Sequence, residues 1–162
     1  MGYEWTVTMA WAGVPLAVMA AVYTAYLFAQ AKARDLWQSS LLPPHLLIQT
    51  LVAGASVALL LSTGGTSVMR QGAAMVLAGA TFVHLLMVLG EVSLPHPTTH
   101  ARLAVREMTA GGYRTFFRAG IVLGAIGMLA PWIGPVAALP ALVGLLAYEH
   151  AYVQSAQSVP LA

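Results

Sequence analysis

The sequence predicts an all-α fold, a polytopic transmembrane helical bundle of about five spans. Only 7% of the 162 residues are charged and 59% are apolar, with a mean hydropathy of +0.79. Soluble domains carry roughly 25% charged residues, so this chain has too few charges to cover a surface that faces water. The apolar residues also gather into long segments separated by prolines, glycines and charges. Lipid must therefore cover most of the protein.

The expected spans form a single transmembrane domain over residues 1–162. Each has enough residues to cross about 30 Å of hydrocarbon at about 1.5 Å per residue. The charges of Lys32 and Arg34 follow the first span, and Pro43 and Pro44 open the second. The expected ranges are 8–31, 44–61, 68–90, 115–133 and 136–154.

Two of these segments carry signals for their packing. Gly120, Gly124 and Gly127 fall on one face of the fourth segment, a spacing that lets helix backbones approach closely. The alternative is that glycines are simply common in membrane helices. Pro140 lies inside the fifth segment and removes one backbone hydrogen bond, so it predicts a kink near the start of that helix.

The longest polar stretch, residues 91–114, separates the third and fourth segments. Within it, residues 101–109 have the pattern of a short amphipathic helix at the membrane surface. The stretch is a candidate docking surface for a soluble partner, and a plain solvated loop is the alternative.

Positive charges predict the orientation of the bundle. Lys32, Arg34 and the arginines of the 91–114 stretch lie on one side, whereas the other side holds only Arg70. The positive-inside rule makes the first side cytoplasmic, with the N-terminus outside and the C-terminus inside. We call this side the basic end of the bundle.

The composition also limits which functions the chain can perform. The net charge is only +2 and reflects scarce acidic residues rather than a basic patch, so no nucleic-acid surface is expected. The chain has no cysteine and cannot ligate an iron–sulfur cluster through thiolates. We therefore expect no metal ligands and no catalytic residue in this chain, and any cluster must belong to a partner.

Ionisable side chains at membrane depth are the candidates for function, because burying them is costly. His84 lies seven residues before Glu91, two turns along the same helix face. The pair predicts a proton route from mid-membrane to the basic end. Glu149 and His150, near the end of the fifth segment, are further candidates for proton transfer. The alternatives are a structural histidine and a pair of interfacial residues.

Aromatic residues supply the candidate ligands for a carbonyl group. Tyr23 and Tyr26 lie three apart on the first segment, and a phenol inside a bundle can donate to a carbonyl, although buried tyrosines are more often structural. Tyr148 and Tyr152 resemble an aromatic belt, and His45 is expected at the interface.

Haem b needs two histidines on facing helices at matching depth, and no pair sits clearly mid-membrane, so haem is not expected.

Two stretches carry a family resemblance. In the first, a tyrosine–threonine–small-residue step at Tyr23 is followed by a basic loop, a tryptophan and a proline-started helix, AVYTAYLFAQAKARDLWQSSLLPPHLLIQTLVAGA. The second is GEVSLPHPTTHARLAVREMTAGGYRTFFRAGIVLG, with YEHAYVQSAQSVPL near the end. As an ordered set they resemble the NrfD/PsrC family, the membrane subunits of polysulfide-reductase-like complexes. The similarity covers nearly the whole chain and corresponds to the later helices of the family only.

The resemblance implies a quinone-reactive membrane anchor in a bacterial or archaeal cytoplasmic (inner) membrane. Such an anchor passes electrons between the quinone pool, menaquinone or ubiquinone, and a partner iron–sulfur subunit, often beside a molybdopterin catalytic subunit. It implies no haem in the membrane subunit. Of the family's quinone-site residues, only the tyrosine of the tyrosine–threonine pair has a counterpart here, which is Tyr23. Tyr26 is the second expected quinone-binding residue. Other family ligands come from a first helix with no expected counterpart among these spans, so we expect a fragment of a longer subunit, a missing half on a separate polypeptide, or an incomplete site.

Two other functions stay open on the residues alone. One is a structural assembly subunit that binds no quinone itself. The other is a small proton-conducting transporter that uses His84 and Glu91 as its path, which an inverted repeat would support. The sequence has no convincing internal repeat.

Overall fold

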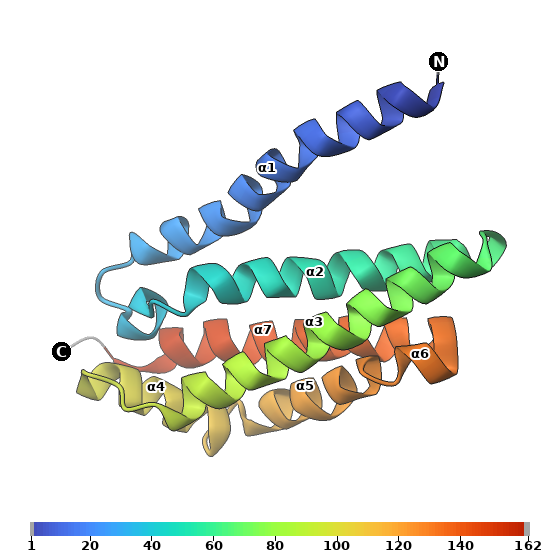
Figure 1. The fold of residues 1–162 in the computed structure, drawn as a ribbon. Helices are drawn as coiled ribbons and strands as arrows, with labels where there is room; N and C mark the ends of the chain where they lie inside the picture. Colours follow the sequence, from blue (N-terminus) through green and yellow to red (C-terminus); the bar gives the residue numbers. More distant parts are fainter. Residues whose placement is uncertain (1, 161–162) are drawn as a thin grey trace.

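The computed structural model describes the backbone of residues 2–160 and the side chains of residues 7–62 and 64–160. Every regular element in this part of the chain is a helix, so the predicted all-α fold is confirmed (Figure 1). The α-helices are α1 (Gly2–Ala29), α2 (Leu42–Leu61), α3 (Ser67–Ser93), α4 (Thr99–Thr109), α5 (Arg114–Gly127), α6 (Ala130–Ile133) and α7 (Ala138–Ser158). Short 3₁₀ helices η1 (Asp35–Gln38), η2 (Ser62–Gly64) and η3 (Gly134–Ala137) join some of them.

Among the described residues, 4 helical stretches are long and apolar enough to cross a membrane. They comprise α1 from Val7, α2, α3, and a last stretch of α6, η3 and α7. The expected segment 115–133 is divided between two helices. α5 has 14 residues, fewer than the about 20 that a span needs, and α6 follows after a short turn. Together α5 and α6 run along α7 (Figure 1).

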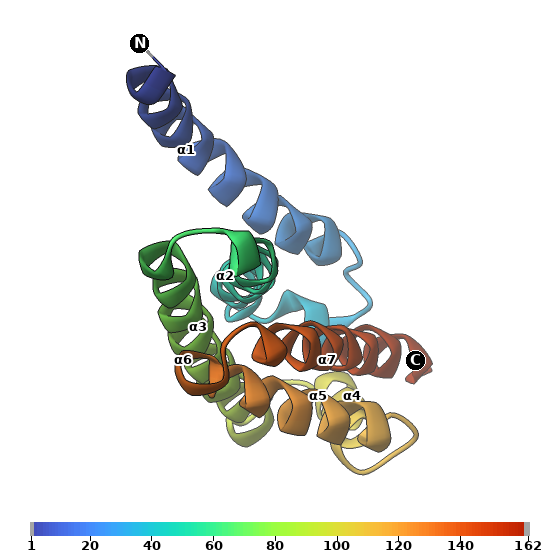
Figure 2. The same cartoon turned by 90° about the vertical axis from the view of Figure 1, so that its right-hand side faces the viewer.

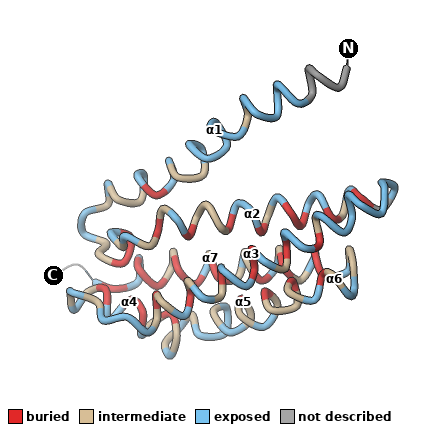
Figure 3. Tube along the Cα trace, viewed as in Figure 1, coloured by how far each residue is buried: buried red, intermediate tan, exposed pale blue. Residues whose placement is uncertain are grey.

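Helix α1 stands apart from the other long helices. Figures 1 and 2 show α2, α3, α5 and α7 packed together while α1 leans away. Only 6% of its apolar span is buried, against 33% for α2 and for α3, and Figure 3 shows exposed residues along most of its length. It meets the bundle near its C-terminal end, where Ala25 is buried and Phe28 packs edge-on against Trp37. Its outer turns are left for lipid or other protein helices to cover.

Glycines allow α5 and α7 to pack closely. Gly120, Gly124 and Gly127 are all buried, as their spacing predicted. A Cβ added at Gly120 would lie 2.9 Å from the Cβ of Tyr148, so no larger residue fits there. Gly144 of α7, which the sequence analysis did not single out, is tighter still, because its added Cβ would lie 2.5 Å from the backbone nitrogen of Gly124.

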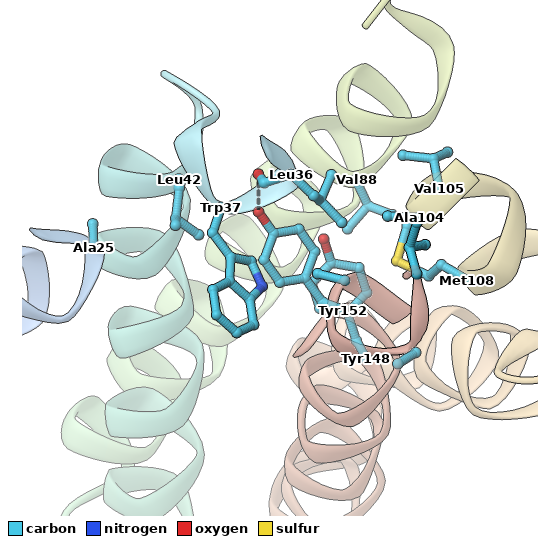
Figure 4. Packing of buried hydrophobic residues seen from close by; sticks show 13 residues of the cluster. Ala25, Leu36, Trp37, Leu42, Val88, Ala104, Val105, Met108, Tyr148 and Tyr152 are labelled. Carbon is cyan, nitrogen blue, oxygen red and sulfur yellow. Dashed lines mark hydrogen bonds between the residues drawn. The ribbon is translucent and has the colours of Figure 1, made fainter. Parts of the chain in front are cut away.

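Hydrogen bonds join the loop between α1 and α2 to the end of α7, at the basic end of the bundle. The guanidinium of Arg34 donates to the carbonyls of Ala156 and Val159, at 3.0 and 2.7 Å. A cation is favourable there, because the last carbonyls of a helix lack intrahelical donors and carry the negative end of its dipole. The hydroxyl of Tyr152 donates to the carbonyl of Leu36 at 3.0 Å (Figure 4). These bonds fix η1 and the start of α2, which carry part of the candidate site.

The polar stretch between α3 and α5 contains a helix rather than a plain loop. The side chain of Thr98 accepts a hydrogen bond from the backbone of Ala101 and so caps α4. The buried face of α4 packs on the bundle, whereas Arg102 and Arg106 are exposed on the other face. The amphipathic pattern of residues 101–109 therefore predicted a real helix. Its buried residues are Ala101, Ala104, Val105 and Met108.

Pro140 lies elsewhere in its helix than the sequence suggested. α7 begins at Ala138, so Pro140 falls in the first helical turn rather than inside the helix. The backbone nitrogens of a first turn have no intrahelical acceptor, and proline removes no hydrogen bond there. The chain turns before this point, at Gly134, whose φ of 65° suits glycine.

Candidate functional site

Polar side chains occupy buried positions on the inner faces of three helices. Each set follows spacings of three, four or seven residues, which place its members on one face of a helix. The buried polar residues on these faces are His45, Gln49 and Ser56 of α2, Thr81, His84 and Glu91 of α3, and Ser155 of α7, together with Tyr148 and Tyr152. We use the term polar column for His45, Gln49, His84, Glu91, Tyr148 and Glu149.

The centre of the polar column is a pair of histidines. His45 Nε2 lies 2.8 Å from His84 Nδ1, and the two side chains are only 2% and 3% exposed. A hydrogen bond between two ring nitrogens needs one proton between them, so the pair forms a one-proton link between α2 and α3. His45 is therefore buried within the bundle, and its place at the membrane interface stays a prediction. It is the partner of the deepest histidine.

His45 and His84 meet one of the conditions for a haem-ligating pair, which the sequence did not indicate. His45 and His84 do lie on facing helices at matching depth. However, they bond directly to each other at 2.8 Å. Two nitrogens on opposite sides of a metal lie about 4 Å apart, because each metal–nitrogen bond is about 2.0 Å. Their geometry in this structure is that of a hydrogen-bonded pair.

The ring of Tyr148, on α7, packs against both histidines. Its ring centroid lies 5.1 Å from that of His84 and 5.5 Å from that of His45. Its side chain is 1% exposed, and its hydroxyl has no hydrogen-bond partner among the described residues. Figure 4 shows the hydroxyls of Tyr148 and Tyr152 pointing the same way, toward the loop of Leu36. Leaving a buried hydroxyl unpaired costs about 1–3 kcal/mol, so this position calls for water or a ligand.

Glu149 joins the polar column from the next position of α7. Its side chain interacts with that of Gln49, which lies one turn after His45 on α2. Glu149 is half-buried, whereas Gln49 is buried. The column therefore continues past the histidines, away from the basic end.

Glu91 forms the end of the column nearest the basic end. One carboxylate oxygen, Oε2, accepts a hydrogen bond from the hydroxyl of Ser39 at 3.2 Å. The other, Oε1, is buried without a partner among the described residues. His96 Nε2 donates to the backbone carbonyl of Glu91 at 2.8 Å, which satisfies a carbonyl near the end of α3.

A surface cleft leads to Glu91. It has a volume of about 440 Å³, and the polar side chains that line it include Asp35, Ser39, Glu91 and His96. Because it lies between the α1–α2 loop and the segment after α3, it belongs to the basic end. The cleft gives the buried carboxylate a short connection to the polar surface of the protein.

The two candidate quinone-binding tyrosines lie on the exposed helix. Tyr23 and Tyr26 are 61% and 65% exposed. Tyr26 lines a smaller pocket of about 180 Å³ between the end of α1 and the loop before α2, with Trp37 and Ser39 on its walls. Cavities of about 150 Å³ hold a benzene ring, so this pocket has room for one ring. Tyr23 lies about one turn away and lines none of these cavities.

The structure brings together three of the four predicted proton-transfer residues. His84, Glu91 and Glu149 belong to the polar column, as described above. His150 is exposed instead, and its ring lies tilted against that of Phe116 of α5 at a centroid distance of 4.5 Å. A one-residue step along a helix turns a side chain by about 100°, which separates His150 from its neighbour Glu149.

Sequence reasoning missed His45, Gln49, Tyr148 and Ser39 as parts of this site. A signal was present on α2, where His45, Gln49 and Ser56 recur at spacings of four and seven in an otherwise apolar helix. Such a polar stripe marks a face that turns away from lipid. Ser39 carries no comparable signal, because its role depends on a loop that folds against α3.

The fold and the site define a class of protein: a multi-pass membrane bundle with titratable groups buried between its helices. The chain belongs to the NrfD family. The family model described as "Polysulphide reductase, NrfD" matches residues 1–153. Members of this family are membrane subunits of quinone-linked oxidoreductase complexes and typically partner with iron–sulfur and molybdopterin subunits. No curated protein and no solved structure matches the chain.

Proposed function

We propose that this chain is the quinone-reactive membrane subunit of an iron–sulfur oxidoreductase complex in a bacterial or archaeal cytoplasmic membrane. It exchanges electrons between menaquinone or ubiquinone and a partner iron–sulfur subunit, beside a molybdopterin catalytic subunit. Membership of the NrfD family supports the class of complex. The observation that carries the proposal further is the polar column, because titratable groups are buried between membrane helices only at considerable cost.

Quinone chemistry explains why such a column is useful. Oxidation of a quinol releases two electrons and two protons. The electrons pass to the cluster of the iron–sulfur partner, since this chain has no cysteine to hold one. The protons need titratable groups that lead to water, and His84, Glu91 and Glu149 can hold and pass them. Reduction of a quinone uses the same groups in reverse.

The pocket beside Tyr26 is our candidate for the quinone headgroup. The phenol of Tyr26 or Tyr23 can donate a hydrogen bond to a quinone carbonyl. The exposed apolar side of α1 supplies a wall for the isoprenoid tail, for example at Leu27. Because both tyrosines are more than half exposed, other helices of the complex are expected to complete the site.

The basic end is our candidate for the docking of the soluble partners. Arg102 and Arg106 are exposed on the outer face of α4, and Arg114 and Arg118 are exposed on α5. Arg106 has no acidic partner among the described residues. A patch of this charge suits an acidic protein surface, and it lies on the same side as the cleft of Glu91.

Substitution of the two tyrosines tests the headgroup site. In the intact complex, Tyr26→Phe is expected to lower quinol turnover about 10-fold, because it removes one hydrogen bond of ~1–1.5 kcal/mol to the headgroup. Tyr23→Phe is expected to have the smaller effect, since Tyr23 lines neither the pocket of Tyr26 nor the cleft of Glu91. Steady-state quinol oxidation and the yield of labelling by a photoreactive quinone measure both.

Trp11→Phe is the matched control for these variants, because Trp11 is an exposed aromatic residue on the same helix, remote from the pocket. It should leave turnover and labelling unchanged. Normal quinol kinetics in both tyrosine variants would remove the tyrosines from the site. Absence of quinone labelling in the unmodified complex would contradict the proposed function itself.

A further inference from the structure

Two cavities at the basic end share a wall. The pocket of Tyr26 opens toward α1, and the cleft of Glu91 opens on the side of α3 and α4. Both are lined by Gln38 and Ser39, the residues that end η1 and follow it. The loop before α2 is therefore a thin partition between a membrane-facing pocket and a polar cleft.

Ser39 is the residue of this partition that bonds to the polar column. Its hydroxyl donates to Oε2 of Glu91 at 3.2 Å and accepts from the backbone nitrogen of Leu41 at 3.3 Å. A serine hydroxyl has one proton to donate and two lone pairs to accept with. These two bonds use the proton and one lone pair, which leaves one lone pair for a donor that enters from the pocket.

We propose that the Ser39 hydroxyl passes protons between a quinol headgroup in the Tyr26 pocket and the carboxylate of Glu91. This inference rests on the proposed function, and it assigns a proton-transfer role to a residue that family membership does not. It also gives the cleft a role: it is the aqueous mouth through which Glu91 exchanges protons with the basic end.

For each proton that the quinol loses, one O–H bond breaks and one forms at every step. As the quinol loses an electron to the iron–sulfur cluster of the partner subunit, its O–H bond breaks and the proton bonds to Ser39 Oγ. The original Oγ–H bond breaks in the same step, and that proton bonds to Oε2 of Glu91. Glu91 then releases the proton to water in the cleft, and the second proton follows the same route with the second electron.

The environment of Glu91 suits this exchange. Its side chain is 2% exposed, yet it belongs to the wall of the cleft, so it is sheltered from lipid and close to water. Its second oxygen, Oε1, is buried without a protein partner among the described residues, so it remains free to accept a proton or a water molecule. Glu91 can therefore take a proton on Oε2 from Ser39, and the same O–H bond breaks when the proton passes to water in the cleft.

Substitution of Ser39 in the intact complex tests the inference. Ser39→Ala is expected to slow quinol turnover by about 10²-fold, the lower part of the range for loss of a general acid or base. Labelling by a photoreactive quinone should persist, because the headgroup pocket keeps its walls. Ser39→Thr, which keeps a hydroxyl, should restore most of the turnover. Ser93→Ala is the matched control, since Ser93 is exposed on α3 and lines neither cavity.

The remaining outcomes overturn the inference in distinguishable ways. Unchanged turnover in Ser39→Ala would show that protons leave by another route. Loss of quinone labelling together with turnover, unrelieved by Ser39→Thr, would make Ser39 a structural residue of the pocket. If the unmodified complex takes up no label, both the inference and the proposed function fail; if only Ser39→Ala behaves unexpectedly, the proposed function stands without this step.

Discussion

Gly144→Ala is expected to destabilise the packing of α5 on α7 more than a methyl group added at any other glycine of that contact. The new Cβ would lie 2.5 Å from the backbone nitrogen of Gly124 and 2.9 Å from the backbone carbon of Leu123. Backbone atoms cannot rotate away as a side chain can, so α5 and α7 must separate. Overpacking typically costs about 1–3 kcal/mol, and a clash with backbone belongs at the upper end.

Thermal unfolding of the purified complex in lipid nanodiscs measures this effect. A loss of about 3 kcal/mol corresponds to a fall in the midpoint on the order of 10 °C for a chain of this size. Gly124→Ala is the matched control from the same contact, because its Cβ would meet only a Leu85 methyl at 4.0 Å. Equal midpoints for the two variants would mean that α5 and α7 do not pack as described.

Glu91→Gln is expected to cause the largest loss of activity. Glutamine keeps the shape of the side chain and can still accept the hydrogen bond from Ser39, but it cannot carry a proton at neutral pH. Loss of a general acid or base lowers rates by about 10²–10⁴-fold, so quinol turnover of the intact complex should fall by about 10²-fold or more. Labelling by a photoreactive quinone should change little.

Glu107→Gln is the control for this variant. Glu107 is a carboxylate at the same end of the bundle, where it accepts a hydrogen bond from the backbone of Gly112, and it belongs to neither cavity. Glutamine can replace it as an acceptor, so turnover should stay near the unmodified rate. Similar turnover in Glu91→Gln and in the control would exclude Glu91 from the proton route.

Much of the fold could be predicted because a membrane imposes simple rules. The scarcity of charges required lipid-facing helices, and apolar length located α1, α2, α3 and most of α7. The division between α5 and α6 was harder, because residues 119–130 contain no polar residue and the turn at Met128 carries no proline or charge. The departure of α1 from the bundle depends on tertiary contacts, which hydropathy does not encode.

The candidate site was only partly predictable. His84 and Glu91 could be paired because they share a face of one helix, and that spacing is visible in the sequence. The link from His84 to His45 could not be predicted in the same way, since 39 positions separate the two residues along the chain. The position of His45 near the start of α2 predicted only an interfacial histidine, and its burial depends on the packing of α2 on α3.

Transfer of electrons from a quinol to the partner's cluster tests the central claim most directly. Quinol is added anaerobically to the purified complex, and reduction of the iron–sulfur cluster is followed by electron paramagnetic resonance. We expect the cluster to be reduced when this chain is present and to stay oxidised when the soluble subunits are prepared without it. Equal reduction in the two preparations would show that the quinone reacts elsewhere and that this chain is not the quinone-reactive subunit.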